Sequence, residues 1–325
     1  SPHWQILGID SRRTIFGHVH DSRNRPQAVR ALSSLRQLEW PPLQGGRLAP
    51  NVLAAAEIED FHRVAAVLCA IRFPYAGLRV LPPGDDAGTR DVRTWCYLEL
   101  AHRVRRHTGA ASLLHQSRAV QGLREAVRES RLTPEETLRA ALSLESLGLI
   151  DEAAALADRV SSSPLAFLFR RQLVERAQRV RQRCLSARSG SVADRSVKAA
   201  GETGTRPERI VREALMKGEI STFQQALPTV TPALRAYYSV LGLPPDTPLE
   251  ERRQLLAAAT ESPDFPRQRT GEARFYLGCL AIEAGDVAAA VRSLQLSEEA
   301  APNSPLAPLR SLYLSQMTGT AAARD

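Results

Sequence analysis

The residues best suited to metal chemistry are two histidines near the N-terminus, in the sequence His18-Val19-His20-Asp21. If this segment is a β-strand, alternate side chains point to the same face, so His18 and His20 could bind zinc together once a third ligand was supplied. The other histidines after this region lie in segments with helical patterns, and nothing in the sequence brings one of them to this pair. We therefore expect surface histidines here, with no bound metal and no cofactor.

Motifs of the common catalytic and nucleotide-binding classes are absent. The sequence has no G-x-x-x-x-G-K loop, no G-x-G-x-x-G turn after a strand, no G-x-S-x-G elbow and no H-E-x-x-H helix. The adjacent pairs Glu250-Glu251 and Glu298-Glu299 would diverge on a helix, since neighbouring residues do not share a helix face. We expect a protein that is not an enzyme.

Positive charge is carried almost entirely by arginine. The chain has 43 Lys+Arg against 35 Asp+Glu, a formal net charge of +8, and Lys198 and Lys217 are its lysines. The planar guanidinium binds carboxylate or phosphate with two parallel hydrogen bonds, which an ammonium group cannot do. This composition is compatible with an anionic partner, or with arginine used simply for solubility.

One helical segment, from Leu165 to Leu185, combines an apolar stripe with a concentration of arginines. A basic amphipathic helix can bind nucleic acid or an anionic membrane, or present a solvated face beside a core stripe. The candidate basic patch consists of Arg170, Arg171, Arg176 and Arg179.

The composition favours helices packed on helices. Apolar residues make up 43% of the chain and aromatic residues 5%, a balance less suited to a β-sandwich. The isolated cysteines, Cys69, Cys96, Cys184 and Cys279, have no metal spacing, so we expect buried free thiols. No segment reaches the roughly 18 apolar residues that a membrane span needs.

Apolar periodicity and breaks in composition divide the chain into four parts. Residues 1–90 are an irregular region with short strands and two helices, and 91–185 form a helical domain in which Thr133 and Glu136 make a capping box. Residues 186–206 have few large apolar side chains and are expected to be a flexible linker. Residues 207–325 hold paired helices and a C-terminal capping helix.

The clearest pair of helices lies between Gly271 and Pro302. Gly285 is suited to a left-handed C-cap and Asp286 to capping the next helix, while small residues at Gly278 and Ala290 allow close helix approach. This order resembles a degenerate tetratricopeptide repeat. The resemblance implies an all-α fold: a solenoid of helix–turn–helix repeats, preceded by a less regular N-terminal helical region.

In that family the first helix of each pair lines a concave groove that holds a peptide or a partner helix. The resemblance therefore implies a scaffold that binds another protein, through an acidic and apolar segment, and supports assembly of a complex. The groove residues implied are Arg139, Leu142, Arg209, Arg212, Phe275 and Tyr276. Nucleic-acid binding through arginine-rich helix faces is the alternative.

The sequence does not identify the partner, the pathway or the oligomeric state. We expect a cytoplasmic location, with an extracytoplasmic one as the alternative if an N-terminal anchor preceded Ser1.

Overall fold

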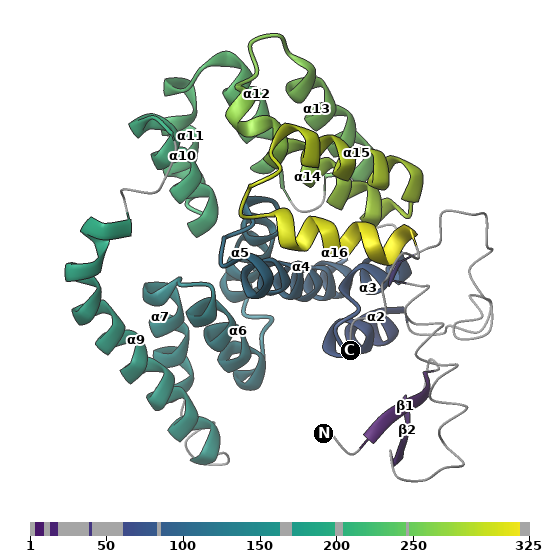
Figure 1. The fold of residues 1–325 in the computed structure, drawn as a ribbon. Helices are drawn as coiled ribbons and strands as arrows, with labels where there is room; N and C mark the ends of the chain where they lie inside the picture. Colours follow the sequence, from purple (N-terminus) through teal and green to yellow (C-terminus); the bar gives the residue numbers. More distant parts are fainter. Residues whose placement is uncertain are drawn as a thin grey trace. The chain divides into compact units, whose positions relative to one another are not determined.

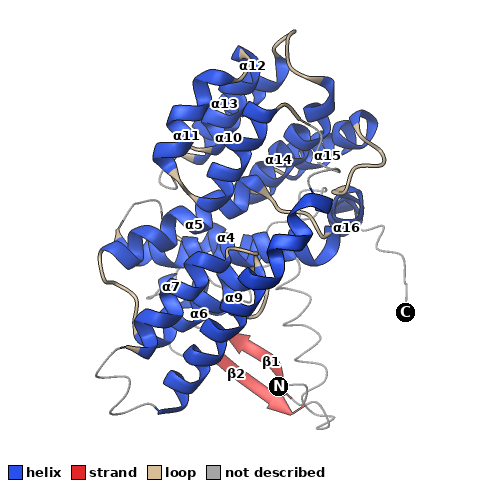
Figure 2. Ribbon diagram, turned by 90° about the vertical axis from the view of Figure 1, so that its left-hand side faces the viewer, coloured by secondary structure: helices blue, strands red, loops and turns tan. Residues whose placement is uncertain are grey.

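The computed structural model describes residues 4–9, 14–18, 39–40, 61–82, 86–162, 171–198, 204–244 and 247–318, and most of these residues are helical (Figure 1). The predicted all-α class is confirmed. The strands among the described residues are β1 (Trp4–Ile9) and β2 (Thr14–His18), which form an antiparallel pair whose register shifts between Ile6 and Gly8 (Figure 2). A two-stranded ribbon of this size is marginal by itself.

The helices follow one another through short turns. In chain order they are α2 (Phe61–Ala70), α3 (Pro74–Val80), α4 (Ala87–Thr108), α5 (Leu113–Arg128), α6 (Pro134–Ser146), α7 (Ile150–Ser161), α9 (Arg171–Lys198), α10 (Arg206–Lys217), α11 (Ile220–Ala226), α12 (Pro232–Leu241), α13 (Leu249–Glu261), α14 (Arg267–Ala284), α15 (Val287–Ala300) and α16 (Ala307–Thr318), with a short 3-10 turn at Leu227–Thr229.

The chain forms two compact units. The first contains residues 1–110 and 231–325, and the second contains residues 111–230. The first unit is therefore discontinuous in sequence. This division differs from the predicted one: α10 and α11, which belong to the predicted repeat domain 207–325, lie in the second unit, where α10 packs on α5.

In the first unit, each helix from α12 to α16 packs against the next along the chain. The stack is closed by the N-terminal helices, because α3 packs on α14 and α4 packs on α16. Tyr97 of α4 also donates a hydrogen bond of 2.7 Å to the carboxylate of Glu283 on α14. With neighbours on several sides, α14 buries most of its length from Gly271 to Ile282.

The α14–α15 hairpin has the local features predicted for it. Gly285 is left-handed (φ 76°), and the Asp286 side chain accepts a hydrogen bond of 3.1 Å from the amide of Ala289. A Cβ atom on Gly278 would lie 2.8 Å from Cγ of Leu294, and the Ser297 hydroxyl donates a 2.7 Å hydrogen bond to the Gly271 carbonyl. The absence of a side chain at Gly278 therefore allows the two helices to pack closely.

Arginines of one helix repeatedly satisfy the carbonyl groups at the C-terminal end of another. Arg310 of α16 donates to the carbonyl oxygens of Ser297, Ala301 and Pro302 at the end of α15. The same relationship is made by Arg252 toward the end of α12, by Arg79 toward α14, by Arg159 toward α5 and by Arg124 toward Gly218 after α10. The last carbonyls of a helix have no partner within it, and the multiple N–H groups of arginine reach several of them at once.

The second unit contains two groups of helices. The first group is α6, α7 and α9, which pack on one another, and the second is α5, α10 and α11, linked by the contact of α5 with α10. The predicted capping box starts α6, since Thr133 and Glu136 each bond the backbone N–H of the other. Arg124 joins the two groups by an ion pair of 2.9 Å with Glu152 at the start of α7.

The expected flexible linker 186–206 is largely replaced by helix. The helix α9 continues to Lys198, and α10 begins at Arg206. The low apolar content of residues 186–198 suggested a linker, but these residues extend a helix that is already formed and whose apolar stripe, Ala177, Val180 and Cys184, is buried. Extending an existing helix adds one hydrogen bond for each residue that is fixed. The correction applies to residues 186–198 and 206, which are helical.

Candidate functional site

The predicted groove residues separate into two groups. Arg139 on α6 is exposed, and Leu142 on α6 and Arg209 and Arg212 on α10 are half-buried, so these four reach the surface. Phe275 and Tyr276 on α14 are completely buried, with Phe275 stacked on Tyr313 at 6.1 Å between ring centroids. The expectation that these two aromatic residues line a groove is therefore wrong. They belong to the core of the first unit.

The predicted basic patch lies on α9, except for Arg170, which is outside the described residues. Arg171, Arg176 and Arg179 are all exposed. Arg171 forms an ion pair of 3.0 Å with Glu175 one turn along the same helix, and Nε of Arg179 donates to the Glu175 carbonyl at 3.4 Å. These three arginines are thus available to solvent, but one of them already has a carboxylate partner.

The arginines further along α9 bind carboxylates of α6 and α7. Arg183 makes two hydrogen bonds of 2.7 Å to the two carboxylate oxygens of Glu145. Its neighbours continue the series, with Arg181 at 3.0 Å from Asp158 and Arg188 at 3.6 Å from Asp151. Much of the positive charge of α9 is consequently balanced within the second unit.

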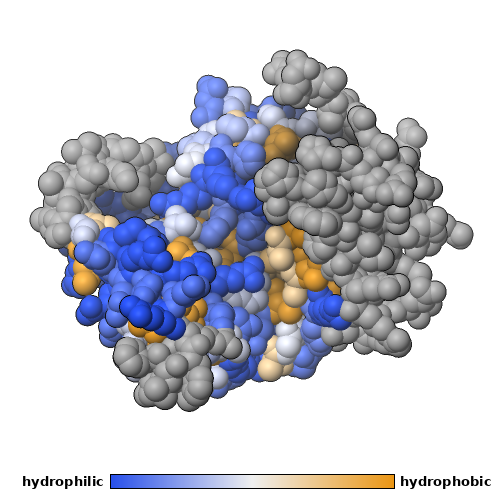
Figure 3. Space-filling view, turned by 90° about the horizontal axis from the view of Figure 1, so that it is seen from below, coloured by the Kyte–Doolittle hydropathy of each residue, from blue (hydrophilic) through white to orange (hydrophobic). Residues whose placement is uncertain are grey.

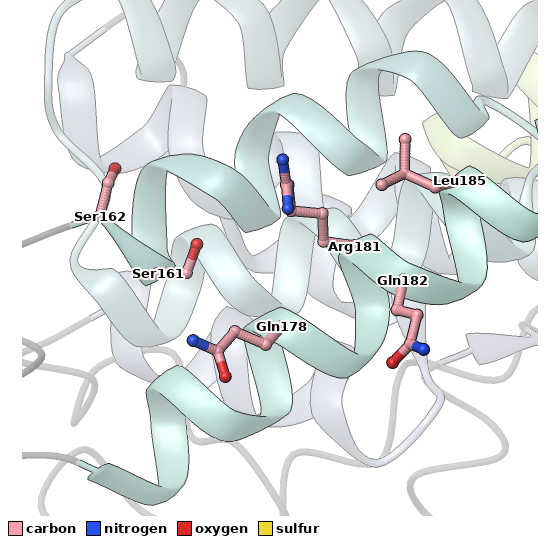
Figure 4. Close-up of a pocket in the computed structure, with 6 residues that line it drawn as sticks. All are labelled: Ser161, Ser162, Gln178, Arg181, Gln182 and Leu185. Atoms are coloured by element: carbon pink, nitrogen blue, oxygen red, sulfur yellow. The ribbon is translucent and has the colours of Figure 1, made fainter.

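A hollow of about 420 Å³ lies where the end of α7 meets α9 (Figure 4). Its lining residues are Ser161 and Ser162 at the end of α7 and Gln178, Arg181, Gln182 and Leu185 on α9. Arg181 and Leu185 point to the same side of α9 in Figure 4. The hollow is lined by hydroxyl and amide groups, one cation and one apolar side chain.

Leu185 gives this hollow its apolar contact. The side chain is 45% exposed, more than the other large hydrophobic side chains that the described part of the chain leaves at the surface. On the face seen in Figure 3, hydrophilic side chains predominate and hydrophobic ones are interspersed among them. An exposed leucine is common by itself, and it becomes informative here because it borders a concave surface.

The histidine pair is not assembled into a metal site by the described residues. His18 is the last residue of β2 and pairs with Trp4, whereas His20 lies outside the described residues. Within the described ranges, no group of three or more His, Cys, Asp or Glu side chains is arranged to hold a metal ion.

A second polar cluster lies at the start of α4, where Asp86 is the N-cap. Its carboxylate accepts from the amide of Thr89 at 3.0 Å and from the Thr89 hydroxyl at 2.5 Å, while Nε2 of His62 lies 2.8 Å from that hydroxyl. These hydrogen bonds, led by that of the hydroxyl, lower the pKa of Asp86 to about 2. Because Thr89 is fully buried, its hydroxyl cannot meet a substrate. The cluster acts as a helix cap.

The first unit also contains a buried ionic network that the sequence did not reveal. Glu39 accepts from Arg103 at 2.8 Å and from the amide of Ala76 at 2.8 Å, and its backbone carbonyl accepts from Arg79. The Arg103 guanidinium also lies 5.7 Å from the ring centroid of Trp40. Burial raises the pKa of Glu39, against the opposing effect of Arg103. A carboxylate just before a Trp-Pro-Pro break gives no sequence signal for a partner 64 residues away.

Comparison with protein-family models, with curated proteins and with solved structures gives no significant match. Within the described ranges, no helix has the length and apolar character required to cross a bilayer. The functional assignment therefore depends on the geometry described above.

Proposed function

We propose that this protein is a non-catalytic scaffold that binds a partner protein on the surface of stacked helices and supports assembly of a complex. The observation that carries the proposal is the stack from α12 to α16, in which each helix packs against the next, together with the close α14–α15 hairpin. Helical repeat proteins expose extended surfaces rather than enclosed pockets, and these surfaces bind segments of other proteins.

We further propose that this stack is a short solenoid of tetratricopeptide-like repeats. Three features support this part of the proposal: the left-handed Gly285, the N-cap Asp286 and the small residues at the helix contact. Of the predicted groove residues, four reach the surface, and all four lie in the second unit: Arg139, Leu142, Arg209 and Arg212.

Nucleic-acid binding through α9 is the less favoured function. Tight binding to a phosphate backbone needs several arginines or lysines that are not already neutralised. On α9, Arg171, Arg181, Arg183 and Arg188 each lie within ion-pair distance of a carboxylate. Elsewhere, arginines such as Arg252 and Arg310 are buried at helix ends. The arginine-rich composition therefore has an internal structural use.

The test is affinity purification of the tagged chain from its native cells, with and without nuclease and at low and raised salt, followed by mass spectrometry. We expect the same protein partner under all four conditions. Replacement of Arg209 and Arg212 by Gln should reduce its recovery, while Arg128→Gln, at an exposed position at the end of α5 and outside the stack, should not. Loss of all bound material after nuclease treatment would support the nucleic-acid alternative instead.

A further inference from the structure

We infer that Cys69 of α2 and Cys96 of α4 are a disulfide pair, whose thiols join when the chain folds in the presence of a disulfide oxidant. The bond links two helices of the first unit covalently. This inference is independent of the proposed function, because it depends only on how α2 packs against α4.

The two cysteines lie at the same level of two helices that pack on each other. Near the start of the contact, Nε2 of His62 on α2 lies 2.8 Å from the hydroxyl of Thr89 on α4. Cys69 follows His62 by seven residues, and Cys96 follows Thr89 by the same number, which is about two helical turns in each case. Helices that touch at the first pair of residues and run in the same direction therefore also bring the second pair together.

A contact beyond the cysteines shows that the helices do run in the same direction. The carbonyl oxygen of Arg72, just after α2, accepts a hydrogen bond of 2.8 Å from Arg103, further along α4. The thiols thus lie between a contact that precedes them and one that follows them. Cys69 is 3% exposed, Cys96 is fully buried, and the two side chains are hydrogen-bonded to each other.

A glycine of α3 leaves room beside the two cysteines. A Cβ atom on Gly77 would lie 3.0 Å from Sγ of Cys96 and 3.7 Å from the backbone nitrogen of Cys69. It would also lie 3.0 Å from the carbonyl oxygen of Ala65 on α2. Because Gly77 has no side chain, α3 places no group between α2 and α4 at this level.

The other two cysteines have different surroundings. Cys279 of α14 is hydrogen-bonded to Tyr75, and Cys184 lies on α9 in the second unit. A disulfide needs two cysteines whose Cα atoms lie within about 7 Å and whose side chains face each other. The hydrogen bond between Cys69 and Cys96 meets the second requirement, so we expect these two cysteines to pair with each other.

The bond forms by exchange with a small disulfide such as oxidised glutathione. The thiolate of one cysteine attacks a sulfur of the small disulfide, whose S–S bond breaks as one small thiolate leaves. The thiolate of the second cysteine then attacks the sulfur of the first, and the mixed disulfide breaks to release the other small thiolate. The two released thiolates take up the two protons that the cysteines lost, so two protein thiols are oxidised and one small disulfide is reduced.

The exchange takes place while the chain folds. In the folded, reduced chain both cysteines are shielded from solvent, and the hydrogen bond with Cys69, together with burial, raises the pKa of Cys96. Since the thiolate is the attacking species, the completed fold protects the pair from an oxidant in solution.

Refolding of the unaltered chain tests the pair. The reduced chain is unfolded in denaturant and diluted into reduced and oxidised glutathione, or into dithiothreitol as the reference. Free thiols are then blocked with N-ethylmaleimide, and the chain is digested with trypsin without reduction. We expect mass spectrometry to find residues 64–72, which contain Cys69, joined to residues 94–103, which contain Cys96, while Cys184 and Cys279 carry the maleimide.

The linked chain should regain the circular dichroism spectrum of the reduced chain and melt about 5–10 °C higher, because the bond restricts the unfolded state. Cys184→Ala is the matched control and should form the link as the wild type does, whereas Cys96→Ala should not. Three results would overturn the inference: no linked peptide, a link to Cys184, Cys279 or a second chain instead, or a linked chain that melts no higher than the reduced one.

Discussion

Glu39 and Arg103 form an ion pair of 2.8 Å in which the two side chains are 1% and 11% exposed. Arg103 also donates to the carbonyl oxygen of Arg72, and its guanidinium lies near the ring of Tyr75. Transfer of two charges from water costs several kcal/mol each, so such a pair persists only when hydrogen bonds satisfy both partners. The pair connects the segment before α2 to the interior of α4.

Removal of the carboxylate of Glu39 should destabilise the first unit strongly. We expect Glu39→Gln to lower the free energy of unfolding by about 3–5 kcal/mol, because Arg103 is left as a buried charge without compensation. Urea denaturation followed by circular dichroism measures the loss. The double variant Glu39→Gln/Arg103→Met removes both charges, keeps a side-chain oxygen that can accept from the amide of Ala76, and should recover most of the lost stability. A double variant as unstable as the single one would show that the charge of Arg103 is not the cause.

The buried Arg310 should be needed for its multiple hydrogen bonds rather than for its charge. In Arg310→Met, the carbonyl oxygens of Ser297, Ala301 and Pro302 lose this donor, although Ser297 and Ala301 each keep a backbone donor. The loss is therefore that of three hydrogen bonds, each contributing about 1 kcal/mol. We expect a loss of about 3 kcal/mol in total, measured by denaturant unfolding.

The conservative change Arg310→Lys should recover only part of this stability, because an ammonium group cannot reproduce the planar fork. The control is Arg292→Met on α15, where the side chain is exposed and the change should stay within about 0.5 kcal/mol. Full recovery with lysine would contradict the role assigned to the guanidinium.

The close contact at Gly278 should not tolerate even one methyl group. The added Cβ would lie 2.8 Å from Leu294, whose side chain is fully buried and cannot move freely. We expect Gly278→Ala to destabilise the first unit by about 1–3 kcal/mol, as overpacked cores do. The double variant Gly278→Ala/Leu294→Val should be less unstable than the sum of the two single variants, as shown by a double-mutant cycle. Simple additivity would mean that the two helices can separate at this point.

The sequence predicted the features that depend on neighbouring residues. The capping box at Thr133, the left-handed Gly285 and the N-cap Asp286 were all predicted and are confirmed, because each is determined within about four residues. The burial of Phe275 and Tyr276 was not predicted. Periodicity identifies a helix but not the number of its neighbours, and α14 contacts α3 as well as α13 and α15.

The hydrogen bonds that arginines make to carbonyl groups far away in the sequence could not be predicted either. Arg79 donates to the carbonyl oxygen of Ile282, 203 residues away, and no local pattern marks either residue. The hollow between α7 and α9 has a similar origin. The helical period placed Arg176 and Arg179 on α9, but the hollow beside Leu185 exists only because α7 ends against α9.

The cap at Asp86 should make part of the stability depend on pH in the acidic range. The pKa of this carboxyl is about 2 in the folded chain and 3.8 as its ordinary value. A lowered pKa means that the unfolded state binds the proton first, so the stabilisation is complete above pH 3.8 and is lost as the pH falls toward about 2. Between pH 3.8 and about pH 2, the melting temperature should fall less for Asp86→Asn than for the wild type. If the melting temperatures of the wild type and of Asp86→Asn fell by the same amount, the Asp86 carboxyl would not be the group whose protonation causes the loss.

The four cysteines should be unreactive in the folded protein. All are free and buried, as the sequence predicted. A hydrogen bond with Cys69, together with burial, raises the pKa of Cys96, and burial raises the pKa of Cys184. Since the thiolate is the nucleophile, alkylation by iodoacetamide near neutral pH should be slow in the native state and complete in denaturant, as measured by intact mass spectrometry. Rapid labelling of Cys69 and Cys96, with Cys184 and Cys279 protected, would show that α2 and α4 separate readily. The control is Cys184→Ala. Because Cys184 lies on α9 in the other unit, its replacement should leave the labelling rates of Cys69 and Cys96 unchanged.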